Sequence, residues 1–339
     1  MFGIKKNLLH LKKIFTNKAI ILMYHSISEP DIDRWELAVS PSNLEQQLQV
    51  LQNSFKISSV TDIASNLQKG RIKNRTVGLT FDDGYRDNFE NAAPLLEKYN
   101  APATFFITNN FGEEKVYWWD RLANLILRTP VLPTDFNITI GEENISCFLS
   151  EECVLNECLD QLHRKWVVPG TPPTKRSTLY YKLWQVMQPL HPGEIQNILE
   201  LIEIWVGRRK EIIFPETSLM TAKQLNKLAN HRLIDIGIHT VNHIALSYHS
   251  GQVQETEILQ NQKQLQQIIN RNITTVAYPY GEYNNTTLEI VEKLGLQAGF
   301  TVEYNVVNHT SNPFKLGRFQ VKNWNARQFQ ENLMEWFKQ

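Results

Sequence analysis

A repeated alternation of apolar runs with amphipathic stretches constrains the fold of this 339-residue sequence more than any other feature. The apolar runs have no helical period, which is typical of strands buried on both faces. They occupy residues 19–25, 76–81, 103–107, 233–238, 275–278, 298–302 and 316–321. Helical patterns separate most of them, and this order indicates parallel pairing with right-handed crossovers. The sequence therefore predicts an α/β fold, namely a distorted or incomplete (β/α)7 barrel.

Several helices of this barrel have recognisable start signals. Pro41 opens one helix, Thr61 is expected to cap a helix over residues 62–68, and Thr221 to cap a helix that ends at Ala229. Further helices are expected at about residues 87–99, 252–269, 286–294 and 326–337. Ligands of such folds bind at the carboxyl ends of the strands, so the residues directly after the apolar runs are the first candidates for a site.

The alternation stops between residues 111 and 219. This stretch contains Trp118-Trp119-Asp120 before one expected helix, a hairpin around Gly141, and helices near residues 151–163, 176–188 and 193–207. It predicts a mostly helical insertion. The expected organisation is an N-terminal segment (1–18), a barrel (19–110 and 220–325), the insertion (111–219) and a C-terminal helix (326–339).

Residues 1–18 combine lysines with interleaved apolar side chains. Two interpretations stay open: an ordinary amphipathic first helix, or a helix resting on an anionic membrane surface. No apolar run of about 20 residues is present to cross a bilayer, and no signal-peptide cleavage pattern is evident. The predicted location is the cytoplasm, with membrane association through residues 1–18 as the alternative.

Charge and cysteine content limit the partners. Thirty-five basic and thirty-five acidic residues cancel, so a nucleic-acid partner is not expected and a neutral or weakly charged substrate is. The three cysteines, Cys147, Cys153 and Cys158, lack the spacing of a zinc or redox motif. They are expected to be free thiols in a reducing compartment.

Polar side chains of a metal-binding kind follow three of the apolar runs: His25, the pair Asp82-Asp83, and His239 with His243. Imidazole and carboxylate suit zinc and its neighbours, and a catalytic site keeps three protein ligands. The two later histidines can face the same way if residues 239–243 make one helical turn. Each feature alone has a simple alternative, such as a turn, a surface pair or a structural histidine. Their joint occurrence at strand ends favours a metal site.

The two adjacent aspartates divide into different tasks. Neighbouring side chains of an extended backbone point in opposite directions, so one carboxylate can bind metal while the other addresses water or substrate. A metal lowers the pKa of bound water, and a nearby carboxylate can accept the proton as that water attacks a carbonyl. The pair therefore divides into a metal ligand and a base for the attack of water on a carbonyl.

Three motifs resemble those of the polysaccharide deacetylases, carbohydrate esterase family 4 with its NodB-like homology domain. They are residues 79–84 (Leu-Thr-Phe-Asp-Asp-Gly), 239–243 (His-Thr-Val-Asn-His) and 277–281 (Ala-Tyr-Pro-Tyr-Gly). The resemblance implies that Asp82 is the catalytic base and that the metal ligands are Asp83, His239 and His243. It also implies that the backbone N–H of Tyr280 helps to stabilise an oxyanion, in a loop stiffened by Pro279.

Two departures from the family pattern concern the rest of the site. The usual general-acid histidine near the C-terminus is missing, but residues 21–25 resemble that strand moved to the front, as in a permuted branch of the family. His25 is therefore the expected acid. Many members begin the third motif with an arginine that orients the base, where this chain has Ala277. Arg318 is the candidate replacement; the alternative is an ordinary surface arginine.

The insertion brings aromatic residues close to a strand end. Trp118 and Trp119 are candidates for stacking against sugar rings, although paired tryptophans are also typical of a packed core. The predicted function is a metal-dependent hydrolase that removes N-acetyl groups from amino sugars of a polysaccharide or glycolipid precursor. Zn2+ is the expected metal, with Co2+, Ni2+ or Mn2+ able to serve. The alternatives are hydrolysis of a cyclic imide or ureide, and a catalytically silent glycan-binding protein.

Overall fold

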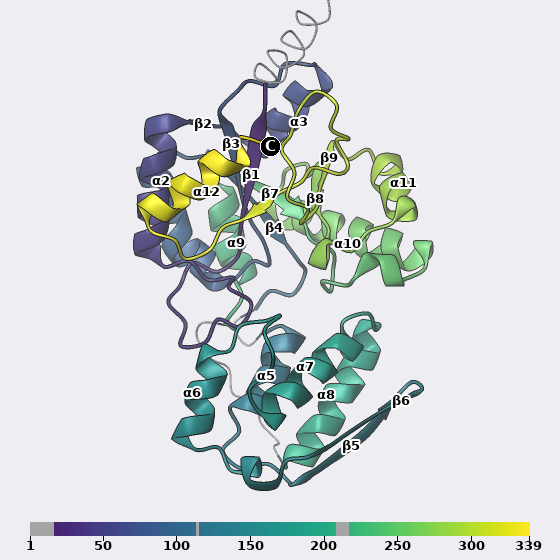
Figure 1. Ribbon diagram of the computed structural model, residues 1–339. Coiled ribbons are helices and arrows are strands. Elements are labelled where there is room, and N and C mark those ends of the chain that lie inside the picture. Colours follow the sequence, from purple (N-terminus) through teal and green to yellow (C-terminus); the bar gives the residue numbers. More distant parts are fainter. Residues whose placement is uncertain (1–16, 113–114, 208–216) are drawn as a thin grey trace, which may run out of the picture.

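The computed structural model describes residues 17–112, 115–207 and 217–339. The amphipathic segment predicted at the N-terminus falls on residues 1–16, which lie outside the described residues. Figure 1 shows two parts: a parallel sheet surrounded by helices, and a smaller helical part that also contains a hairpin. Among the described residues, no helix combines the length and the apolar character needed to cross a membrane.

The sheet confirms the predicted fold class. Its hydrogen-bonded order is β10-β1-β3-β4-β7-β8-β9, all neighbours are parallel, and the short strand β2 pairs with β3. The strands are β1 (Ala19–Tyr24), β2 (Lys56–Ile57), β3 (Thr76–Phe81), β4 (Ala103–Ile107), β7 (Ile234–Ile238), β8 (Thr275–Ala277), β9 (Ala298–Phe300) and β10 (Phe319–Gln320). Every residue of β1, β3 and β4 is buried, because helices cover the outer face and side chains fill the inner one.

Strand register brings the predicted site residues to one edge of the sheet. Tyr24 of β1 lies opposite Phe81 of β3, so His25 and Asp82 follow at neighbouring positions. Ile107 of β4 lies opposite Ile238 of β7, the residue before His239. The carboxyl ends of four strands thus converge, as the alternation of the sequence predicts.

One short segment near the C-terminus reaches both edges of the sheet. Leu316 forms a parallel bridge to Phe300 of β9, and three residues later Phe319 pairs with Leu22 of β1. Residues 316–320 therefore complete the ring between the last and the first strand. Arg318 lies in the middle of this closing segment and is fully buried.

The outer helices begin largely where the sequence indicates. They are α2 (Pro41–Ser54), α3 (Val60–Gln68), α4 (Ala93–Lys98), α9 (Ala222–Ala229), α10 (Gly251–Ile269), α11 (Asn285–Lys293) and α12 (Ala326–Trp336). Thr221 caps α9 as predicted. The predicted cap of α3 is wrong: the helix starts at Val60 and the Ser59 side chain accepts from the Asp62 N–H. Thr61 instead donates its hydroxyl to Asp235 at 2.9 Å.

The expected helix over residues 87–99 is divided. Its first part, η1 (Asn88–Ala92), is a π-helical turn, and α4 follows it directly. Pro94 near the start of α4 has no N–H to donate to the preceding turn, which is compatible with a locally wider helix.

Residues 118–206 pack around a hydrophobic cluster of their own. Their elements are α5 (Trp118–Leu127), β5 (Asp135–Ile140), β6 (Glu143–Phe148), α6 (Glu157–Lys165), α7 (Lys175–Met187) and α8 (Pro192–Val206). The hairpin β5–β6 turns at Gly141 as predicted. The helix expected from residue 151 begins later, because Asn156 caps it. Buried Arg176 donates to the carbonyl oxygens of Thr129, Glu152 and Cys153, each at 2.6 Å, and links these elements.

Candidate active site

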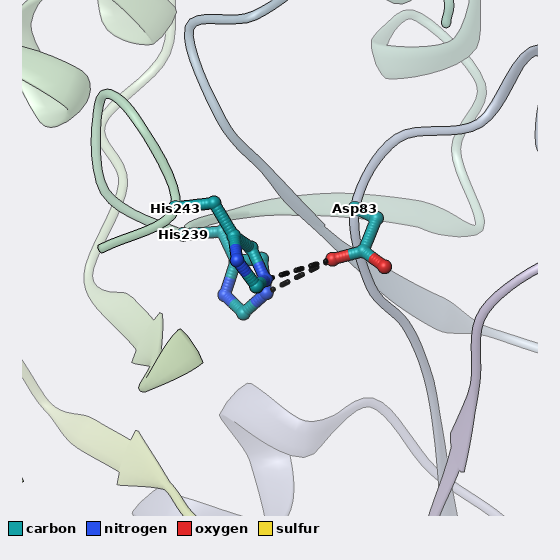
Figure 2. Close-up of side chains that lie close together, drawn as sticks. All are labelled: Asp83, His239 and His243. Carbon is teal, nitrogen blue, oxygen red and sulfur yellow. Dashed lines mark ion pairs between the residues drawn. The ribbon is translucent and has the colours of Figure 1, made fainter. Parts of the chain in front are cut away.

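The three predicted metal ligands converge in the structure. Asp83 Oδ1 lies 3.3 Å from His239 Nε2 and 3.2 Å from His243 Nε2, and all three side chains are buried. One ligand atom from each residue lies within 4.8 Å of the others. Figure 2 shows both imidazoles facing the Asp83 carboxylate. They are the one such group of three found among the described residues.

The two histidines converge through a tight turn and not through a helix. Residues 239–243 are not helical, so the condition of one helical turn is wrong. Thr240 has φ of 64° and His243 has φ of 55°, and this left-handed backbone turns both rings to the same point. Asp83 is also left-handed, with φ of 73°. Such conformations are unfavourable for residues other than glycine, and they cluster at functional sites.

Neighbouring elements fix the histidine loop. His239 Nδ1 lies 2.9 Å from the Ala277 carbonyl oxygen, so Nδ1 is assigned as the donor and Nε2 offers its lone pair. The His239 N–H donates to Asn261 of α10 at 2.9 Å. Glu257, also of α10, accepts both the Asn242 backbone N–H at 2.9 Å and its side-chain amide at 2.7 Å. The loop is therefore held at three points.

The donor set fits a divalent cation. Asp83 Oδ1 is buried and has no hydrogen-bond partner, although the Nε2 atoms of His239 and His243 lie close to it. A carboxylate oxygen facing an imidazole lone pair is repulsive unless a cation lies between them. Two imidazoles and one carboxylate are also the ligand number and type of catalytic zinc sites.

The second aspartate has a partner of a different kind. Arg318 donates from Nη1 to Asp82 Oδ1 and from Nη2 to Oδ2, both at 2.7 Å, and both side chains are buried. Arg318 also donates from Nε to the Thr301 carbonyl oxygen at 3.0 Å. Its guanidinium is fully buried, so the alternative of a surface arginine is wrong.

This pairing decides the charge of the carboxyl group. Burial by itself would raise the pKa of Asp82, but the nearby charge of Arg318, helped by His239, outweighs burial. The pKa of Asp82 therefore lies below its ordinary value, and the carboxylate stays ionised and fixed in orientation.

His25 lies at the same edge but is held differently. Its side chain is partly exposed, and its Nδ1 is buried without a hydrogen-bond partner among the described residues. It lines a cavity of about 400 Å3 together with the aspartates and histidines of the other motifs, Asp82, Asp83, His239 and His243. All the sequence-predicted acid, base and ligand residues therefore face one cavity.

Aromatic side chains form much of the wall of this cavity, and the sequence reasoning missed several of them. Trp35 of the loop after β1 and Trp184 of α7 lie with ring centroids 4.5 Å apart, and both line the cavity with Tyr304. Trp184 shows that the insertion contributes to the site. Its position in the middle of a helix far along the chain gave no sequence signal for this role.

The two tryptophans that the sequence predicted for sugar stacking line different cavities. Trp119 lines the cavity, but it is almost fully buried, 4.2 Å from the Tyr117 ring and 4.8 Å from the His243 ring. Trp118 lines another cavity, of about 270 Å3, and donates from Nε1 to the Tyr280 hydroxyl at 3.2 Å. Tyr280 follows buried Pro279 in a left-handed conformation, with φ of 57°.

Comparison with known proteins matches this arrangement to one family. The family model described as polysaccharide deacetylase matches residues 69–129 and 197–299, which include all three motifs. The predicted resemblance to the polysaccharide deacetylase family is confirmed. The deacetylase is 22% identical over 323 residues to a poly-beta-1,6-N-acetyl-D-glucosamine N-deacetylase of Staphylococcus aureus, covering 90% of this chain and 79% of that protein.

Solved structures support the fold of the deacetylase. The Streptococcus pyogenes deacetylase PplD in complex with acetate aligns with a TM-score of 0.58 at 20% identity, over 95% of this chain and 99% of that chain. IcaB from Ammonifex degensii aligns with a TM-score of 0.55 at 16% identity, over 95% and 98%. The predicted family, fold class and hydrolase class are confirmed. The cytoplasmic location and a membrane contact of residues 1–18 stay predictions.

Proposed function

We propose that this deacetylase hydrolyses the acetamide of N-acetylated amino sugars in a glycan, and releases acetate and a free amine. The observation that carries the proposal is the set of groups around one cavity: three convergent ligands, a carboxylate paired with arginine, and a histidine beside them. These are the groups that hydrolysis of an unactivated amide needs: a metal site, a base and an acid.

Asp83, His239 and His243 would hold the divalent ion, and Zn2+ is the metal we expect; Co2+, Ni2+ and Mn2+ suit the same ligands. Such an ion supplies a more acidic water and a Lewis acid that polarises the amide carbonyl. The turn that joins the two histidines, and its contacts to α10, preorganise the ligands.

The other residues act on protons and developing charge. Asp82 takes a proton from the attacking water, and Arg318 keeps this base ionised and aligned. The backbone N–H of Tyr280 donates to the oxyanion as the carbonyl carbon becomes tetrahedral. His25 gives a proton to the departing nitrogen, the C–N bond breaks, and the products are acetate and an amine. Before the next turnover, Asp82 releases the accepted proton to solvent and His25 takes up a proton from solvent.

The cavity wall suits a sugar ring. Trp35, Trp184 and Tyr304 line it with aromatic rings, and such rings pack well against the C–H faces of pyranose rings. The name of the S. aureus relative specifies a polymer of N-acetyl-D-glucosamine. We therefore propose an N-acetylglucosamine glycan, as a polymer or a lipid-linked precursor, as the substrate of this chain.

The test is acetate release from N-acetylglucosamine oligomers and lipid-linked precursors, with metal analysis of the same sample. The native chain should bind one divalent ion and release acetate, and Asp82→Asn should keep the ion but lose activity. Release of acid from a cyclic imide or ureide, and none from acetylated sugars, would point to another amide substrate. Glycan binding without hydrolysis in the metal-loaded chain would indicate a silent site.

A further inference from the structure

The loop that follows β1 and contains His25 is tied to the residues that follow the Asp82-Asp83 motif. Asn88 donates from Nδ2 to the His25 carbonyl oxygen at 2.6 Å. Asn91 donates from Nδ2 to the Ile27 carbonyl oxygen at 2.8 Å. Asn88 is fully buried. Both asparagines lie on the π-helical turn η1, so this turn fixes the backbone of the acid candidate.

Asp87, the residue before η1, completes these contacts. It accepts the Ser26 hydroxyl at 2.7 Å and the Ile27 backbone N–H at 2.9 Å. It also accepts from Asn88 Nδ2 at 2.7 Å. We call Asp87, Asn88 and Asn91 the loop clamp. Residues 25–27 therefore contact side chains of the clamp at three successive positions, through backbone groups of His25 and Ile27 and through the Ser26 hydroxyl.

The clamp retains two locally unfavourable features. A π-helical turn is rare and is found mostly at functional sites. Burial, with a smaller contribution from the charge of Glu90, raises the pKa of Asp87 to about 6. A carboxylate that is harder to ionise than in water, next to an unusual helix, indicates that these positions do more than cap a helix.

The imidazole of His25 depends on this backbone support. Its Nδ1 has no partner among the described residues, so no side-chain contact of that nitrogen fixes the ring. A general acid must come within hydrogen-bond reach of the leaving atom. Misplacement by about 1 Å can lower a rate about 100-fold.

We propose that the loop clamp is a positioning device for His25, which sets the imidazole against the nitrogen that leaves. The inference rests on the proposed function, because it assumes that His25 is the acid. Since η1 begins four residues after the turn at Gly84, the same stretch of chain holds both the base and the acid. The clamp residues are positioning residues, not catalytic ones.

The first test compares two substrates with different leaving groups. Asp87→Ala should lower kcat about 10- to 100-fold on an N-acetylglucosamine oligomer, with unchanged KM and metal content. It should leave the hydrolysis of 4-nitrophenyl acetate unchanged, because nitrophenolate leaves without a proton. Asp87→Asn, which keeps part of the hydrogen bonding, should lose less. An equal loss on both substrates would show a merely structural role and overturn the inference.

The control and the double variant sharpen this test. Asp235→Asn removes a carboxylate that accepts from Thr61 on another part of the barrel, and it should match the native chain on both substrates. On a His25→Ala background, Asp87→Ala should cause no further loss of kcat. An additive loss on that background would overturn the inference, because the clamp would then act without His25.

A measurement without turnover separates the clamp from the proposed function. In Asp87→Ala, the NMR signals of the His25 ring should broaden or average, and those of His163, which is buried and bonded to Thr174, should not change. Unchanged His25 signals would overturn the inference. If the native chain released no acetate, the proposed function would fail, and this measurement would still decide whether the clamp orders His25.

Discussion

The metal half and the acid half of the site are built in different ways. Asp83, His239 and His243 are buried, their loops contain left-handed residues, and His239 is held by hydrogen bonds to acceptors on α10 and β8. His25 is partly exposed and is held mainly through its backbone. The metal half is thus fixed before substrate arrives, whereas the acid half depends on a supporting loop. We therefore expect substitutions in the two halves to change activity and stability in different ways.

Loss of the metal half should have the largest effect. Chelation of the ion, or Asp83→Ala, should lower activity by about 10³-fold or more, because several kcal/mol of transition-state stabilisation are lost. Added Zn2+ should restore the chelated native chain but not the variant. Acetate release and metal content measure this. Full activity of the metal-free chain would show that the metal half is not required for the reaction.

Breaking the Asp82–Arg318 pair should affect both activity and stability. Arg318→Met leaves a buried carboxylate without its partner, so the free energy of unfolding should fall by about 3–5 kcal/mol. The double variant Asp82→Asn with Arg318→Met should recover much of this stability but no activity. Denaturant unfolding and acetate release measure the two effects. If Arg318→Met alone were as stable as the native chain, the ion pair between Asp82 and Arg318 would be contradicted.

In the acid half, replacement of Asp87 should stabilise the folded protein although it lowers activity. The folded-state pKa of Asp87, about 6, lies above its ordinary value of 3.8, so the folded protein loses stability as pH rises from 4 to 6. Asp87→Asn does not titrate and should be more stable than the native chain above pH 6, by about 2 kcal/mol after allowance for partial exposure. The gain should vanish below pH 4. A constant difference across this window in unfolding experiments would refute the assignment.

The smallest effect is expected at the aromatic wall, which belongs to neither half. Trp184→Ala should raise KM for N-acetylglucosamine oligomers about 5- to 10-fold with little change in kcat, because one stacking contact of about 1 kcal/mol is lost. Trp205→Ala, also in the insertion but not among the residues that line this cavity, should leave KM unchanged, because the Trp205 indole donates to the Asp135 carbonyl oxygen instead. A fall in kcat alone would mean that Trp184 supports the reacting groups and not the sugar.

The sequence was sufficient for what is local or strictly periodic. The strands at residues 76–81 and 103–107 were predicted to the residue, and motif order brought Asp83, His239 and His243 together correctly. Strand-end position alone placed His25 at the same cavity. These features depend on the alternation of apolar and polar residues, which a single sequence displays.

What the sequence could not supply depends on contacts between distant segments or on unusual backbone. The left-handed Thr240 and His243 contradict the helical turn that the motif suggested. The sequence did not indicate this backbone, because neither threonine nor histidine by itself indicates a left-handed conformation. Trp184 reaches the cavity only through the packing of the insertion. Asp87 and Asn88 looked like an ordinary helix start, since nothing in the local pattern marks a π-helical turn.

The ion pair of the base, Asp82, forms only when residues 316–320 close the sheet between β9 and β1. Arg318 and Asp82 are 236 positions apart, so their ion pair closes a long loop of the chain. A chain that has formed its early strands but has not yet joined β10 to β1 would contain every metal ligand and yet lack the partner of its base. The paired base therefore requires that β10 joins β1, and the metal ligands alone do not complete the site.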